Sequence, residues 1–270
     1  SLNFGQKYAF GLNLFSSFAK NYMEEFTLST IVVICLSVLF TGIAKAGIPG
    51  ASSVIVPILA ICMGGKISVG FLLPVSFVAS FISAIKNRTD INWKALLKVL
   101  PWALIGIGLG AWLGDIANER MFFFLLSIVI LVGCAITIVQ HIKHSAFRDQ
   151  YGISITLFGV LAGFSAMIGN ATGPLISTLF LLQRFPKKQF IDTYVWFCLI
   201  TDFIKIPFHV FLWHSISNES LLLGLYTLPI MVIGIFGGFW LTKVLSDRVY
   251  QNTIITLSCI TAIFLLIFYS

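Results

Sequence analysis

The fold of this chain is decided at a six-residue break, Lys45-Ala46-Gly47-Ile48-Pro49-Gly50, which interrupts an apolar run from Leu28 to Met63. Glycine and proline disfavour a helix, and proline also removes a backbone donor and clashes with the preceding turn. Inside hydrocarbon, a broken backbone needs hydrogen bonds from protein or from a water-lined cavity. A lysine beside the break adds a charge that is costly to bury there. The break is therefore either a loop outside a bilayer or the floor of a binding site.

A second break, Gly169-Asn170-Ala171-Thr172-Gly173-Pro174, occupies the matching place in the second half of the chain. Paired interruptions of apolar segments point to the substrate site of a membrane transporter. The recurrence therefore favours a binding site over the alternative, which is two ordinary turns at the membrane surface with Lys45 solvated.

Composition restricts the fold class to an all-α polytopic membrane protein. The 270 residues are 58% hydrophobic and 10% charged, with a mean hydropathy of +0.99, and a soluble domain could not solvate such a surface. The net charge of +7 comes from basic residues in short loops at membrane edges, so it predicts no nucleic-acid partner. The five cysteines lie in apolar runs without Cys-x-x-Cys or clustered His/Cys spacing, which predicts small core residues, no metal site and no cofactor.

The apolar segments form two sets around a polar linker at 141–150. Residues 1–25 mix aromatic and charged side chains and are predicted to be an interfacial leader, with a flexible leader as the alternative. The first repeat, 26–140, holds apolar segments 26–44, 51–63, 69–85, 95–114 and 121–140. The second repeat, 151–270, holds segments 151–168, 174–183, 190–213, 220–244 and 250–269.

Segments 51–63 and 174–183 are too short to cross ~30 Å of hydrocarbon at ~1.5 Å per residue. We expect each to complete a broken or re-entrant helix hairpin with the segment before it, followed by about three transmembrane helices. Two full crossings in place of each hairpin remain the alternative. Either count of crossings is odd, so the two halves are predicted to be inverted-topology repeats. Lysine and arginine gather on the side of the 141–150 linker, which places that side in the cytoplasm and both termini outside.

A repeated glycine motif supports the duplication. Leu-Pro-x4-Gly-x3-Gly-x2-Leu occurs once in each half, beginning at Leu100 and at Leu228. Small residues four apart let helices approach closely. The glycines of this motif are therefore interpreted as packing residues rather than ligand contacts: Gly106, Gly110, Gly234 and Gly238.

Ionisable residues inside apolar segments are functional candidates because burying them is costly. Asp202 and Lys205 are three apart on one predicted helix and can pair. Thr201, Lys205 and His209 follow at a spacing of four and form one polar stripe. Two interpretations of Asp202–Lys205 stay open, a substrate or coupling site and a neutralised pair that locks two helices. His209 is interpreted first as an interface histidine, and as a coupling group in the alternative.

The two breaks could together bind an anion. Serine and threonine suit helix N-caps and proline suits the first turn, so helices are predicted to begin near Ala51 and Pro174. Helix N-termini carry free N–H donors and a partial positive charge. Two such ends that meet near the midplane would cradle oxyanions, and the lysines would add full charge. The predicted substrate-binding residues are Lys45, Gly47, Gly50, Ala51, Ser52, Ser53, Asn170, Thr172, Gly173 and Lys205, and the predicted coupling or gating residues are Asp202, His209 and Thr201.

These motifs resemble a known family. Gly42-Ile-Ala-Lys45-Ala-Gly47-Ile-Pro49-Gly50, followed by a short apolar helix, is similar to the first signature of the TauE/SafE sulfite exporter family. Gly163-x5-Gly169-Asn-Ala-Thr-Gly173-Pro174 resembles the partner signature. The resemblance covers roughly residues 28–269, and it implies export of a small sulfur-containing anion, such as sulfite or sulfoacetate, across a bacterial cytoplasmic (inner) membrane.

The expected function is therefore secondary transport by alternating access, with one half rocking against the other. An anion channel that uses the same cradle is the alternative. An enzyme is not expected, because the chain has no His-Glu-x-x-His and no Gly-x-Ser-x-Gly motif. The expected partners are a small anion and the lipid bilayer, with homodimer formation left open.

Overall fold

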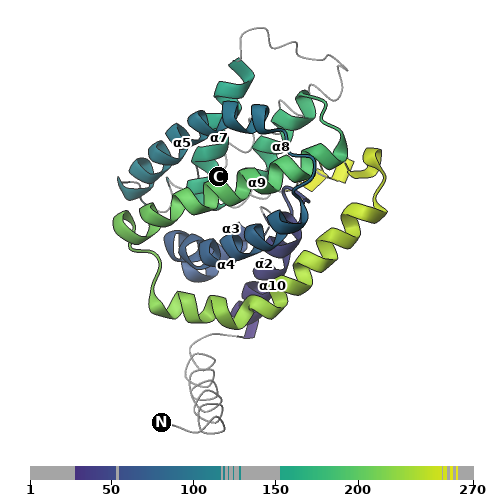
Figure 1. Ribbon diagram of the computed structural model, residues 1–270. Helices are drawn as coiled ribbons and strands as arrows, with labels where there is room; N and C mark the ends of the chain where they lie inside the picture. The colour runs from purple at the N-terminus through teal and green to yellow at the C-terminus, as the bar shows by residue number, and fades with distance from the viewer. Residues whose placement is uncertain are drawn as a thin grey trace, which may run out of the picture.

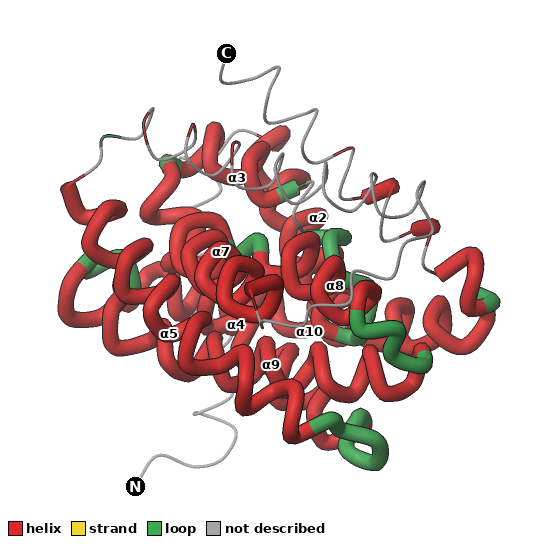
Figure 2. Tube along the Cα trace, turned by 90° about the horizontal axis from the view of Figure 1, so that it is seen from above, coloured by secondary structure: helices red, strands yellow, loops and turns green. Residues whose placement is uncertain are grey.

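The structure is a computed structural model that describes residues 28–52, 55–116 and 153–250, with single residues at 118, 121, 124, 128, 252, 253, 256, 257 and 260. The predicted leader 1–25, the linker 141–150 and most of segments 121–140 and 250–269 lie outside the described residues. All described regular structure is helical (Figure 2). The helices are α2 (Leu28–Lys45), α3 (Val56–Met63), α4 (Gly65–Lys86), α5 (Trp93–Ile116), α7 (Ile153–Gly169), α8 (Thr172–Leu182), α9 (Lys187–Pro207), the π-helix η1 (Phe208–Leu212) and α10 (Asn218–Val244).

Five described stretches are long and apolar enough to cross a membrane: α2, α4, α5, α9 continued by η1, and α10. This confirms an all-helical polytopic membrane protein. The 8 residues of α3 and 11 of α8 are too few for a crossing at ~1.5 Å per residue. Each short helix packs on its neighbours in the chain, α3 on α2 and α4, and α8 on α7 and α9.

The long helix α9 runs through the middle of the molecule (Figure 1). It contacts α4, α5 and α8. Pro207 ends the α-helical part, and the chain continues as the π-helix η1. The ring of a proline cannot donate to the preceding turn, which gives a physical reason for the change of helix type there.

The two most extensive helix contacts join α5 to α7 and α10 to α2. Each depends on glycine. A Cβ atom built on Gly106 would lie 2.0 Å from Val160 O, and one built on Gly234 would lie 2.2 Å from Leu39 O. On the facing helices, Gly163 and Gly42 are equally tight against α5 and α10. This confirms the packing role predicted for the repeated glycine motif, and it shows that each half packs on the first described helix of the other half.

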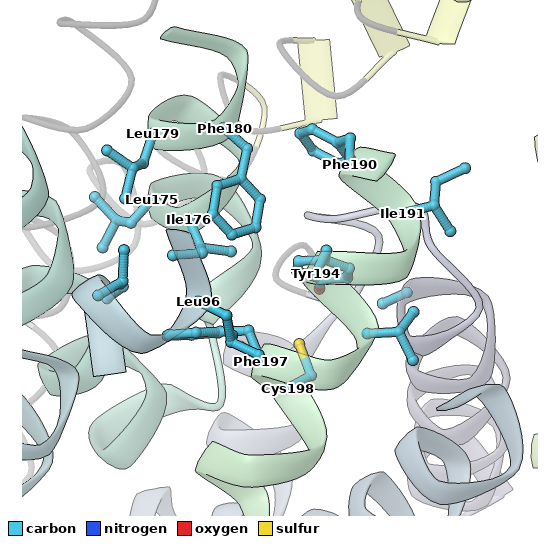
Figure 3. Packing of buried hydrophobic residues seen from close by; sticks show 14 of the residues in the cluster. Leu96, Leu175, Ile176, Leu179, Phe180, Phe190, Ile191, Tyr194, Phe197 and Cys198 are labelled. Atoms are coloured by element: carbon cyan, nitrogen blue, oxygen red, sulfur yellow. The ribbon is translucent and has the colours of Figure 1, made fainter. Parts of the chain in front are cut away.

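A buried apolar cluster fixes α8 against α9 and α5. Figure 3 shows Ile176 and Phe180 on the side of α8 that faces the side chains of α9, whereas Leu175 and Leu179 lie on its other side, within the same cluster. Phe180 meets Phe190 edge-on, with ring centroids 5.9 Å apart. Because these side chains are fully buried, the short helix that follows the second break is held rigidly by apolar contacts.

Candidate functional site

The first break is built from tight turns. α2 ends at Lys45, and the Ala46 and Gly47 N–H groups still donate to Gly42 O and Ala44 O, at 3.0 and 3.2 Å. Gly47 and Gly50 have φ values of 115° and 89°, a region that glycine adopts without strain. Lys45 is only 4% exposed. A solvated lysine at an ordinary surface turn therefore does not describe this structure.

The helix after the first break begins later than predicted. The sequence predicts a start near Ala51, whereas α3 starts at Val56, and its N-cap residue Ile55 makes no side-chain cap. The Ser52 carbonyl, not its hydroxyl, accepts the Ile55 and Val56 N–H groups. Pro57 lacks an N–H donor and is tolerated only in a first turn, so a start close to it is favoured. Ala51 and Ser52 are buried beside the break, and Ser53 lies outside the described residues.

The second break is shorter and contains one strained residue. α7 ends at Gly169, and Asn170 has a positive φ of 49°, which asparagine tolerates better than most residues. The Ala171 N–H donates to Ser165 O at 3.2 Å. α8 then begins at Thr172, two residues before the predicted start, so Pro174 is its third residue instead of its first.

The two breaks touch each other. A Cβ atom built on Gly173 would lie 2.4 Å from Gly50 N, so the backbones are in direct contact at this point. Gly47 meets the Ile191 side chain of α9 in the same way, and its carbonyl accepts the hydroxyl of Tyr250. The predicted residues Gly47, Gly50 and Gly173 thus lie where chain segments from both halves approach closely.

A buried charge cluster is centred on Asp202. Its Oδ2 accepts from Lys45 Nζ at 2.8 Å and from Ser76 Oγ and Ser80 Oγ at 2.9 Å each. Its Oδ1 lies 2.9 Å from Lys205 Nζ. All five side chains are buried. The carboxylate is therefore shared between two lysines, and two serine hydroxyls from α4 complete its coordination.

Lys205 connects this cluster to the second break. Its ammonium group donates to Asn170 Oδ1 at 2.8 Å and to Ala166 O at 3.2 Å. Ala166 lies in the last turn of α7, where a cation interacts favourably with the helix dipole and the free carbonyls. A continuous series of polar contacts therefore runs from the first break, through Lys45, Asp202 and Lys205, to Asn170 in the second.

Two donors beside the second break have no partner among the described residues. They are Asn170 Nδ2 and Thr172 Oγ1, and both side chains are buried. A buried polar group without a hydrogen bond costs free energy, and such groups often belong to functional sites. Thr172 opens α8, whose first N–H groups are also free of intrahelical partners. The second break therefore offers several hydrogen-bond donors at one place.

The structure separates the two remaining coupling candidates from the cluster. Thr201 Oγ1 is buried and bonds its own helix, at Phe197 O and Cys198 O. His209 lies in η1, where Nδ1 is 2.8 Å from Ser215 Oγ and the ring meets Trp213 edge-on. Its buried Nε2 has no partner among the described residues. Of the predicted polar stripe, Lys205 alone bonds Asp202 directly within the described contacts.

Ser76 and Ser80, which bond Asp202 from α4, were not among the predicted site residues. The available signal was their spacing of four in an apolar segment, which puts both hydroxyls on one helix face. Serines are common in membrane helices because they bond their own backbone, as Ser37 does in α2. Spacing alone therefore did not distinguish them, and only the position of α9 against α4 shows their partner.

Comparison with known proteins gives one match. No curated protein and no solved structure matches this chain. The sequence model of one family, described as "Sulfite exporter TauE/SafE", matches residues 34–265, which include both breaks and the whole charge cluster. The chain therefore belongs to the TauE/SafE family of sulfite exporters.

Proposed function

We propose that this protein is a secondary transporter that exports a small sulfur-containing anion, sulfite or an organosulfonate such as sulfoacetate, by alternating access. The observation that carries the proposal is the buried Lys45–Asp202–Lys205 cluster where the two breaks meet. Two ammonium groups and one carboxylate leave one positive charge uncompensated when all three are ionised. An uncompensated charge in a membrane interior is costly, and a bound monoanion would neutralise it.

The donors around the cluster suit an oxyanion. Sulfite and sulfonate groups carry three oxygens that accept hydrogen bonds, and the second break supplies Asn170 Nδ2, Thr172 Oγ1 and the first N–H groups of α8. The contact between Gly50 and Gly173 brings the first break to the same place. These features support a site for one small anion between the breaks.

The direction and the mechanism are part of the proposal. With the linker side in the cytoplasm of an inner membrane and both termini outside, a negative interior drives each negative charge outward by about 2.3 kcal/mol per 100 mV. Inverted repeats would let the substrate site open alternately to each side. The burial of Lys45, Asp202 and Lys205 supports a carrier with an occluded site over the alternative, a channel with a continuous pore.

Anion binding by the purified protein tests this function. Sulfite, sulfoacetate, sulfolactate, sulfate, taurine and acetate are titrated calorimetrically into wild type and Lys45→Met in detergent. We expect saturable binding of sulfite or a sulfonate by wild type, and a loss of at least about tenfold in affinity when one charged donor is removed. Acetate and sulfate control for non-specific anion effects. Absence of binding by any sulfur anion would overturn the proposal.

Reconstituted vesicles then separate carrier from channel. With a carrier, unlabelled substrate loaded inside the vesicles accelerates the uptake of labelled substrate, and the flux saturates as the substrate concentration rises. A channel does neither at the same concentrations. Absence of both counterflow and saturation would favour the channel.

A further inference from the structure

Asp202 has a role that anion binding alone does not require. Resting on the proposed function, we propose that Asp202 competes with the substrate for Lys45. Its carboxylate pairs with the Lys45 ammonium when the site is empty and releases this lysine to the arriving anion. The substrate class is the small oxyanion already proposed, and the new element is the exchange of Lys45 between two anions.

The contacts of the two lysines differ in a way that selects Lys45 as the exchanged group. Lys205 donates hydrogen bonds to Asn170 Oδ1 and Ala166 O and also forms an ion pair with Asp202 Oδ1, at 2.9 Å. Lys205 is therefore held from α7 as well as from its own helix. Lys45 meets the opposite carboxylate oxygen, Asp202 Oδ2, and it is the last residue of α2, directly before the glycine turns of the first break.

The coordination of Asp202 allows this exchange. When Lys45 turns away, Oδ2 keeps its bonds to Ser76 and Ser80, and Oδ1 keeps its ion pair with Lys205. The carboxylate therefore stays neutralised and hydrogen-bonded. A carboxylate that lost its last partner in a buried site would instead carry a large desolvation penalty. The two serines thus make release of Lys45 less costly, which gives them a function beyond packing.

This arrangement predicts that removing the Asp202 carboxylate and removing its serine partners change the anion affinity in opposite directions. Asp202→Asn removes the competitor and adds one positive charge to the cluster, so sulfite or sulfoacetate should bind about tenfold more tightly or better. Ser76→Ala/Ser80→Ala keeps every charge but leaves Oδ2 dependent on Lys45, so the same anions should bind about tenfold more weakly. A purely structural role for Asp202 predicts weaker binding in both variants.

Turnover gives a second measurement. Because Asp202 is needed to take Lys45 back, Asp202→Asn should lower KM and kcat together in vesicle export assays. The matched control is Asp192→Asn, another buried aspartate on α9, which bonds Lys188 and the Asp90 backbone away from the cluster. This control should leave the anion affinity unchanged.

Infrared difference spectra provide a readout that does not need a destabilised variant. Adding sulfite to wild type should shift a carboxylate band as Lys45 leaves Asp202, and the band should persist in Asp192→Asn. Tighter anion binding by Asp202→Asn and weaker binding by Ser76→Ala/Ser80→Ala, together with this band shift, would establish the exchange. Binding by wild type with unchanged or weaker affinity in Asp202→Asn would overturn it while leaving the transport function intact, and absence of binding by both would overturn both.

Discussion

The two breaks occupy matching places in the chain but contribute different things to the site. The first, described at residues 46–52 and at residue 55, contains tight turns with two glycines at positive φ, and it follows a lysine. The second, Asn170 and Ala171, is almost continuous with its helices, and two buried donors without described partners lie in it and directly after it, Asn170 Nδ2 and Thr172 Oγ1. The first break therefore lies beside the charge of Lys45, and the second supplies hydrogen-bond donors. A duplicated motif can thus divide the work of binding an anion.

The largest expected effect comes from adding a side chain where the backbones of the two breaks touch. Gly173→Val would place side-chain carbons against the Gly50 backbone, where a Cβ already comes within 2.4 Å. Because backbone cannot give way as a flexible side chain does, we expect a loss of about 3 kcal/mol or more in stability, measured by thermal unfolding in detergent. Gly108→Ala is the control, since its Cβ would meet nothing within 4 Å. Equal stability of the two variants would contradict the contact.

The next comparison concerns the two lysines. Lys205→Met removes the partner of Asn170 Oδ1 and Ala166 O, so we expect it to lower stability by about 1–3 kcal/mol. Lys45→Met should have a smaller effect on stability, because Asp202 keeps Lys205, Ser76 and Ser80. Both should abolish export of sulfite or sulfoacetate from vesicles. Greater destabilisation by Lys45→Met would reverse the assignment of the fixed and the exchanged lysine.

The smallest expected effect comes from removing one hydroxyl group from each break and comparing the anion affinities. Thr172→Val keeps the shape of a side chain whose hydroxyl has no described partner, so we expect unfolding temperature to stay the same or to rise. Anion affinity should fall by about tenfold, the equivalent of one hydrogen bond to a charged group. Ser52→Ala in the first break is the matched change, with little expected loss. The division of work between the breaks would be wrong if Ser52→Ala weakened binding more than Thr172→Val.

Much of the fold could be predicted because the length of each apolar segment in a membrane protein can be read directly from its sequence. Segments 69–85, 95–114 and 220–244 match α4, α5 and α10 to within a few residues. The start of α3 was placed five residues too early, because Ala51 lies in a turn in which its N–H donates to Ile48 O. The inverted orientation of the halves stays a prediction.

The candidate site could be predicted in part. Lys45, Asp202 and Lys205 were recognisable because an ionisable residue in an apolar segment is costly and therefore conspicuous. Their mutual pairing was only half visible, since Asp202 and Lys205 are three apart in one helix whereas Lys45 reaches Asp202 from 157 residues away. Ser76 and Ser80 were missed because a serine hydroxyl that bonds a distant carboxylate and one that bonds its own helix give the same sequence pattern.

The glycine contacts between α2 and α10 also have a consequence for biosynthesis. α2 is the first described helix to leave the ribosome, but its closest partner begins at Asn218, near the other end of the chain. By contrast, α5 meets α7 with far fewer residues between them. Contacts of long sequence separation form late, so the surface of α2 around Gly42 must face lipid or a chaperone until α10 has been inserted. A chain that stops after α9 would keep its lysine and aspartate but lack the helix that closes over the first break.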